Sequence, residues 1–117
     1  MEEENLQQLC KQYIMGVHDA MDLLNGKWKI SIIAVLFYHK ERRFSEILTE
    51  VKGISNKMLS KELKDLEINQ LVKRKVLDKQ PIAVEYSLTD YGYELQDMIN
   101  SLSNWGIKHR EKIIHSK

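Results

Sequence analysis

The sequence contains few of the residues that mark secreted, membrane-embedded or loop-rich proteins. Cys10 is its one cysteine, so no disulfide can form within the chain. One proline and five glycines in 117 residues favour helices and short turns over long irregular loops. The most apolar run, ISIIAVLF at 30–37, is far shorter than the roughly 20 residues of a membrane-spanning helix. Because the N-terminus MEEENLQQL is acidic and polar, unlike a signal peptide, we expect a soluble cytoplasmic protein that does not enter membranes.

The sequence also lacks the residue patterns of a catalytic or metal site. Its four histidines are scattered, and no two of them have the spacing of a helical metal pair. GISNK at 53–57 lacks the spacing of a phosphate-binding loop, and no serine lies in a nucleophile elbow. We therefore predict a protein with no enzymatic activity, no metal and no cofactor.

Length and composition predict one globular domain, 1–117. Hydrophobic residues make up 43% of the chain and charged residues 30%, which is enough apolar material for a real core. The net charge is only +1, but residues 40–79 hold eleven Lys or Arg against seven Asp or Glu. A basic middle segment is typical of a surface that binds a polyanion, and a chance surplus is the alternative.

The N-terminal third of the sequence predicts helices. Apolar spacing predicts an amphipathic helix at 3–15 and a second short helical segment, HDAMDLL, after Gly16. The run at 27–38 is hydrophobic nearly all round, which predicts a buried central helix. HKERR, at 39–43, is predicted to be a charged turn.

The next part of the sequence predicts two helices joined by a short turn. FSEILTEV at 44–51 predicts a short helix that Gly53 ends. Ser55 is expected to cap a second helix at 56–69. This arrangement over 44–69 is typical of a helix-turn-helix.

Beyond this motif, the apolar period changes from that of a helix to that of a strand. LVKRKVL and AVEYSL, separated by DKQPI with the only proline, predict a β-hairpin at 72–88. Thr89 is then expected to cap one long helix over 90–114. Because a hairpin directly after a helix-turn-helix forms a wing, the predicted fold class is mainly α with a small β-hairpin. It is a winged helix-turn-helix with extra N- and C-terminal helices.

The helix predicted at 56–69 has one apolar face and one polar, basic face. Leu59, Leu63 and Leu66 are expected to pack inward, whereas the outward residues crowd its N-terminal half. Lysine, asparagine and serine can bond base edges or phosphates, and a helix N-terminus adds free N–H groups. We predict that this face contacts DNA through Ser55, Asn56, Lys57, Ser60, Lys61 and Lys64. A solvated helix face is the alternative, but the adjoining turn and hairpin favour DNA.

Basic residues flanking that helix are candidates for contacts with the phosphate backbone. Cations on a hairpin suit the backbone, and its tip suits a minor groove. The candidates are Arg42, Arg43, Lys73, Lys75 and Lys79. Solvated turn and sheet residues are the alternative, and the strand pattern does not favour Arg74 over Lys75.

Apolar stripes lie on both terminal helices. The C-terminal helix is long for a domain of this size, so its far end is expected to project beyond the core, and a projecting apolar stripe needs a partner. We predict a homodimer seam formed by Leu6, Leu9, Tyr13, Leu95, Met98, Ile99, Leu102 and Trp105. The C-terminal members of this set could instead belong to the core or line a ligand pocket.

Five segments together resemble a known family. LNGKWKISIIAVL, RRFSEI, GISNKMLSKELKDLE, LVKRKVL and VEYSLTDYG occur in the order and spacing of the HxlR-type winged helix-turn-helix transcriptional regulators of bacteria, relatives of the MarR group. The resemblance covers about residues 17–106. It implies a homodimer that binds double-stranded DNA, regulates transcription and has no enzymatic activity.

The resemblance also implies a role for each part of the chain. The recognition helix would be 56–69 and the wing 72–88, with dimerisation helices at about 1–25 and 90–117. Trp28, Phe44 and Tyr86 match hydrophobic positions of the family, and we expect them in the core.

Cys10 departs from the pattern of the redox-sensing members of this family. These members carry a reactive cysteine before the GKW segment, and the matching position here is Met15. Cys10 lies on the same predicted helix and is the remaining candidate for a redox sensor. The alternative is an inert, partly buried thiol, because only Lys11 is adjacent to stabilise a thiolate.

Two further interpretations stay open at this point. A winged helix can be a protein–protein interaction module without specific DNA binding, since fold does not fix function. The lysine-rich face argues against this, because the cores of protein interfaces are depleted of lysine. A small-molecule effector could also bind in an apolar cleft between the long helix and the DNA-binding part, although no residue identifies it.

Overall fold

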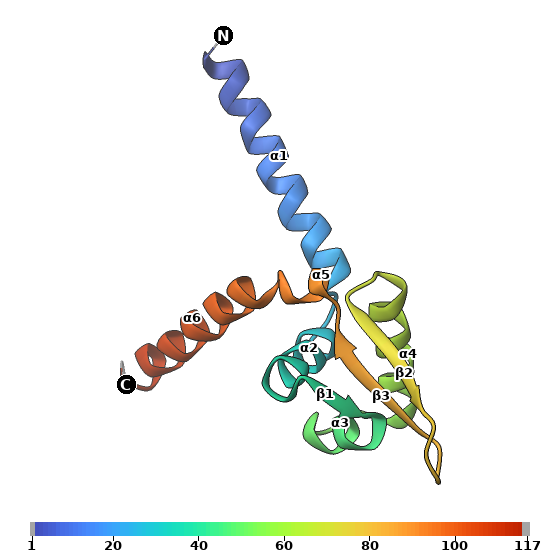
Figure 1. Ribbon diagram of the computed structural model, residues 1–117. Coiled ribbons are helices and arrows are strands. Elements are labelled where there is room, and N and C mark those ends of the chain that lie inside the picture. Colours follow the sequence, from blue (N-terminus) through green and yellow to red (C-terminus); the bar gives the residue numbers. More distant parts are fainter. Residues whose placement is uncertain (1, 116–117) are drawn as a thin grey trace.

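The computed structural model describes residues 2–115 (Figure 1). The predicted terminal segments also include Met1, Ser116 and Lys117, which lie outside the described residues. The elements, in chain order, are α1 (Glu2–Leu23), α2 (Trp28–His39), β1 (Glu41–Arg43), α3 (Phe44–Glu50), α4 (Asn56–Ile68), β2 (Val72–Leu77), β3 (Ala83–Leu88), α5 (Asp90–Tyr93) and α6 (Gln96–His115). The predicted fold class, mainly helical with a small antiparallel sheet, is confirmed.

Helix α2 is the centre of the core. Its side chains Ile32, Ile33 and Leu36 have no exposed surface, and they pack in one cluster with Leu59 and Leu63 of α4. Such a helix is hydrophobic nearly all round because other elements cover it on most sides. Of the three aromatic residues expected in the core, Tyr86 is buried, whereas Trp28 and Phe44 are half-buried against it.

The sheet has three strands, in the order β1-β3-β2. The hairpin of β2 and β3 was predicted. The prediction of a charged turn at 39–43 was wrong, because Glu41–Arg43 forms β1 and pairs antiparallel with β3. Lys40 has a φ of 61°, which turns the chain away from α2 and lays the following three residues along the free edge of β3. A strand this short carries no period that sequence analysis can detect.

The predicted break after Gly16 is absent, since α1 runs unbroken from Glu2 to Leu23. Gly16 is exposed and a Cβ added there would meet nothing, so the glycine weakens the helix without ending it.

The predicted single C-terminal helix is instead two. Thr89 caps α5 as expected, with its Oγ accepting a hydrogen bond from the N–H of Gly92 at 2.9 Å. The N–H groups of Glu94 and Leu95 then bond carbonyls three residues back, at Tyr91 and Gly92. This tighter winding separates α5 from α6.

The terminal helices extend away from the core. In Figure 1, α1 rises from the body in one direction and α6 leaves it in another, and the molecule measures 65 × 43 × 22 Å. None of the residues in α1 is buried. Within the described part of the chain, no helix is both long enough and apolar enough to cross a membrane.

Candidate nucleic-acid interface

The helix-turn-helix is formed by α3 and α4. Between them the chain turns at Gly53, whose φ of +91° is strained for other residues. The Oγ of Ser55 accepts a hydrogen bond from the N–H of Met58 at 3.0 Å, so the predicted N-cap of α4 is confirmed. The cap fixes where α4 begins and therefore which residues its first turn presents.

Helix α4 has the two faces that its sequence predicts. Leu59, Leu63 and Leu66 are buried in the core. The polar residues exposed to solvent from the cap as far as Lys64 are Ser55, Asn56, Lys57, Ser60, Lys61 and Lys64. These residues present donors, a helix N-terminus and positive charge together, which is the chemistry that a DNA major groove accepts.

A hollow of about 330 Å³ lies between α4 and the wing. Its lining comprises Ser60, Lys64, Glu67, Arg74 and Tyr86. Arg74 faces Tyr86 across the β2–β3 pair, so it lies on the side of the sheet that faces α4. Two cations and two hydroxyl groups around one hollow could hold a phosphate, with the Glu67 carboxylate at its margin. Sequence analysis did not single out Arg74, because the pattern alone does not say which strand face meets α4.

Lys73 and Lys75 lie on the opposite face of the sheet from Arg74. Their partners on β3 are Ser87 and Glu85, and successive side chains of a strand alternate between faces. Lys79 is exposed in the loop at the wing tip. Ile82, also at the tip, is 71% exposed, and it was missed because an isolated isoleucine in a loop carries no pattern.

Arg42 is tied to neighbouring elements rather than free for a phosphate. One of its terminal nitrogens donates to Glu46 Oε2 at 2.9 Å, and the other lies 2.7 Å from His39 Nδ1. Its Nε lies 3.1 Å from a carboxylate oxygen of Glu50. These contacts join α2, β1 and α3, so the geometry favours a structural role for Arg42 over the predicted phosphate contact.

Arg43 is exposed, and it acts on α3 through its backbone. Its N–H donates to Glu46 Oε1 at 2.9 Å. This hydrogen bond lowers the pKa of the Glu46 carboxyl, desolvation opposes it, and the charges of Arg42 and Arg43 lower the pKa further. An ionised Glu46 therefore holds the start of α3 and leaves the Arg43 side chain at the surface.

The predicted seam residues fall into two groups. Ile99 is buried in the core of this chain, and Leu95 and Met98 pack against that core. Ile99 is therefore covered within this chain, where the beginning of α6 crosses over the core. The seam residues that remain exposed are Leu6, Leu9, Tyr13, Leu102 and Trp105. Trp105 stacks on His109 of the same helix, with ring centroids 4.9 Å apart.

An apolar cavity of about 550 Å³ lies where α1, α2 and the start of α6 meet. Its lining includes Met21, Leu24, Ile30, Met98 and Leu102. No residue of the helix-turn-helix or the wing lines this cavity, so it is not the predicted cleft between the long helix and the DNA-binding part. The Cys10 thiol lies well before it on α1 and is exposed. No cluster of His, Cys, Asp or Glu suited to a metal occurs among residues 2–115.

Known proteins are similar to this chain in sequence and in fold. The HxlR-like helix-turn-helix family model matches residues 23–114. The HTH-type transcriptional regulator YtcD of Bacillus subtilis is 33% identical over 103 residues, which cover 88% of this chain and 81% of YtcD. The HTH-type transcriptional regulator YodB of Bacillus subtilis is 39% identical over 89 residues, covering 76% of this chain and 79% of YodB.

Solved structures agree with these relatives. The crystal structure of YtcD has a TM-score of 0.76 at 34% identity, covering 81% of this chain and 96% of that one. The reduced redox regulator HypR has a TM-score of 0.73 at 33% identity, covering 87% and 99%. The reduced form of YodB has a TM-score of 0.68 at 40% identity, covering 75% and 85%. The chain therefore belongs to the HxlR-like helix-turn-helix family and is a transcriptional regulator of the winged-helix type.

Proposed function

We propose that the protein binds double-stranded DNA with sequence specificity, as a homodimer, and thereby regulates transcription. The observation that carries this proposal is the continuous surface formed by the exposed N-terminal half of α4 and Arg74 of the wing. Helix α4 would lie in a major groove, and its exposed residues Asn56, Lys57 and Lys61 would reach base edges. The hollow between α4 and the wing would hold a phosphate of the flanking backbone. A protein-binding surface would be expected to contain less lysine.

Arg74→Ala is expected to weaken DNA binding more than Lys73→Ala, because only Arg74 lines the hollow beside Lys64. The two substitutions remove the same charge from adjacent, exposed positions, so each is the control for the other. The probe is a duplex that the wild-type protein selects from a random pool, and Kd is measured by fluorescence anisotropy from 50 to 200 mM salt. Loss of one phosphate contact should reduce the slope of log K against log salt by about 1. Equal effects of the two variants would place the backbone contact elsewhere on the wing.

The dimer proposal rests on α1. A helix of 22 residues with no buried residue has little to hold it in water, because most helical stability in proteins comes from tertiary packing. Its exposed Leu6, Leu9 and Tyr13 need a partner, as do Leu102 and Trp105 of α6. A second copy supplies the same two stripes, so we propose that α1 and the exposed part of α6 form the seam of a homodimer.

Leu9→Asp is expected to shift the protein from dimer to monomer, because it places a carboxylate in the proposed seam. Gln8→Asp introduces the same charge and serves as the control, since helical spacing points residue 8 away from the stripe. Sedimentation velocity at micromolar concentration measures both variants. A wild-type protein that sediments as a monomer would refute the seam.

We also propose that oxidation of Cys10 controls this dimer. The thiol is exposed on α1 beside Leu9. Two structural relatives, the redox regulator HypR and the transcriptional regulator YodB, have solved structures of their reduced forms. Two Cys10 thiols would lose two protons and two electrons to diamide, which becomes the hydrazine, and would join in a disulfide.

Diamide is therefore expected to give a cross-linked dimer on a non-reducing gel and to change DNA affinity. Cys10→Ser should prevent both effects while keeping the affinity of the reduced protein. Wild-type protein that stays uncross-linked, with unchanged DNA binding, would make Cys10 an inert thiol.

A further inference from the structure

A buried ion pair joins the core to the recognition helix. Among residues 2–115, the buried charged side chains are Lys29 of α2, 7% exposed, and Glu62 of α4, 6% exposed. Lys29 Nζ donates to Glu62 Oε2 at 2.8 Å and lies 3.4 Å from Asp65 Oδ2. Lys29 and Glu62 are 33 residues apart in the sequence, so their meeting is a property of the fold.

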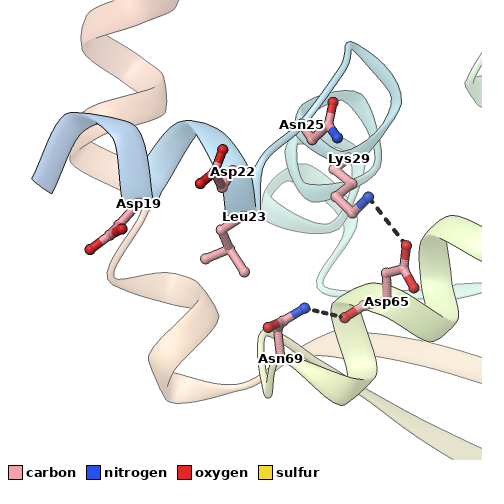
Figure 2. A pocket seen from close by; sticks show the side chains of 7 residues that line it. All are labelled: Asp19, Asp22, Leu23, Asn25, Lys29, Asp65 and Asn69. Atoms are coloured by element: carbon pink, nitrogen blue, oxygen red, sulfur yellow. Dashed lines mark hydrogen bonds and ion pairs between the residues drawn. The ribbon is translucent and has the colours of Figure 1, made fainter. Parts of the chain in front are cut away.

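Two helices place carboxylates near Lys29, and its ion pairs are made with only one of them, α4. Lys29 lines a polar cavity of about 400 Å³. Figure 2 shows Asp65 of α4 and Asn69, which follows the end of that helix, on one side, and Asp19 and Asp22 of α1 on another. The ion pairs of Lys29 are made with α4, although α1 offers two carboxylates around the same cavity. Asn69 Nδ2 in turn donates to the Asp65 carbonyl oxygen at 2.8 Å, closing the end of the helix.

Stability alone does not account for a buried ion pair. Removing a lysine and a glutamate from water costs several kcal/mol, and apolar residues of similar size in their place are often neutral or stabilising. Burial lowers the pKa of Lys29. The hydrogen bonds that Lys29 makes with Glu62 and Asp65, together with the negative charges of these two residues, outweigh this effect and leave the pKa raised. Lys29 therefore stays charged at neutral pH, and the pair persists as a directional contact.

The apolar contacts that hold α4 against the core are not directional. Leu59, Leu63 and Leu66 hold the helix through apolar contact, which tolerates small rotations and slides. Glu62 is adjacent in sequence to Lys61, so a rotation of α4 that separates Glu62 from Lys29 moves Lys61 by the same angle. A side chain reading a base edge must be placed within a few tenths of an ångström.

We propose that Lys29 and Glu62, supported by Asp65, are positioning residues that set the rotation of α4 for sequence-specific DNA recognition. This inference rests on the DNA-binding function proposed above and adds residues that never touch DNA. The ion pair thus contributes to the specificity of DNA binding, whereas the leucines of α4 contribute to the stability of the fold.

The test replaces both partners together. The double variant Lys29→Met/Glu62→Met leaves no buried charge unpaired and keeps the net charge, so nonspecific, electrostatic binding should not change. Kd is measured at 150 mM salt for the wild-type-selected duplex and for a scrambled duplex, beside thermal unfolding. The specificity ratio is the Kd for the scrambled duplex divided by the Kd for the selected duplex. It is expected to fall at least about 10-fold, which corresponds to the loss of a base contact worth 1–3 kcal/mol, while the Kd for the scrambled duplex stays within about 2-fold of the wild-type value.

Conservative variants separate positioning from structure. Lys29→Arg keeps the positive charge but replaces a compact ammonium by a larger planar guanidinium, so it should retain only part of the specificity ratio. Glu62→Asp, which keeps both charges but withdraws the carboxylate by one methylene, should lower the ratio even if the double variant fails to fold. An unchanged ratio in a folded double variant or in Glu62→Asp would overturn the proposal. A wild-type protein that prefers no duplex would instead refute the DNA-binding function itself.

Discussion

Lys61→Ala is expected to lower the affinity of the protein for its selected duplex by about 5- to 150-fold, corresponding to about 1–3 kcal/mol for a base contact. Lys61 is exposed near the middle of α4, one helical turn after Lys57 and three residues before Lys64. Lys61 lies in the N-terminal half of α4, which is the half that contacts base edges when a recognition helix docks in the major groove. Lys57→Ala and Lys64→Ala are expected to have smaller effects, because Lys57 lies at one end of the exposed face and Lys64 lines the hollow proposed for a phosphate.

Lys108→Ala is the matched control for this prediction. Lys108 is an exposed lysine of α6, away from the helix-turn-helix, so its removal takes away one charge without touching the proposed DNA-contacting face. Sedimentation velocity checks that this variant keeps the oligomeric state of the wild type. Anisotropy titrations at 150 mM salt should show near-wild-type affinity for this variant. If all three α4 variants also bound like wild type, the contact surface would lie elsewhere.

Gly92→Ala is expected to destabilise the fold by about 3 kcal/mol, at the upper end of what overpacking usually costs. A Cβ on Gly92 would collide with the carbonyl oxygen of Leu71 and lie 3.2 Å from a methyl group of Leu88. The Leu71 carbonyl cannot simply move aside, because it accepts a hydrogen bond from the Thr89 N–H at 3.0 Å. The close approach joins α5 to the strand entering the wing, which explains the glycine of the VEYSLTDYG segment.

Gly16→Ala is the control for this substitution. A Cβ at Gly16 meets no atom within 4 Å, and the residue lies within α1, so alanine should stabilise by up to about 1 kcal/mol. Urea denaturation monitored by circular dichroism measures both. A Gly92→Ala variant as stable as wild type would show that α5 can be displaced from Leu71 at little cost.

The elements that sequence analysis predicted correctly are those whose local signals agree. Helix α4 has a cap at Ser55, an apolar period and a preceding turn glycine, and each signal is contained within about fifteen residues of sequence. Helix α2 was predictable because a long apolar run has few alternatives to a buried helix. The hairpin followed from two short runs of strand formers around a proline.

The features that sequence analysis missed depend on contacts between distant residues. Strand β1 exists because β3 has a free edge, and Arg42 is held by Glu50 of the following helix. The role of Arg74 depends on which strand face meets α4, and the partner of Lys29 lies 33 residues away. Ile99 was assigned to the seam because an apolar stripe looks the same whether a core or a partner covers it.

The most direct test of specific DNA binding is selection from a pool of random duplexes at physiological salt, followed by sequencing. A dimer that places two α4 helices in successive major grooves should enrich a two-fold symmetric site, with half-sites about 34 Å apart or a multiple of that spacing. The selected duplex should then compete against excess nonspecific DNA. A pool that stays unenriched after repeated rounds, with binding that vanishes as salt rises, would contradict sequence-specific recognition and leave only nonspecific electrostatic attraction.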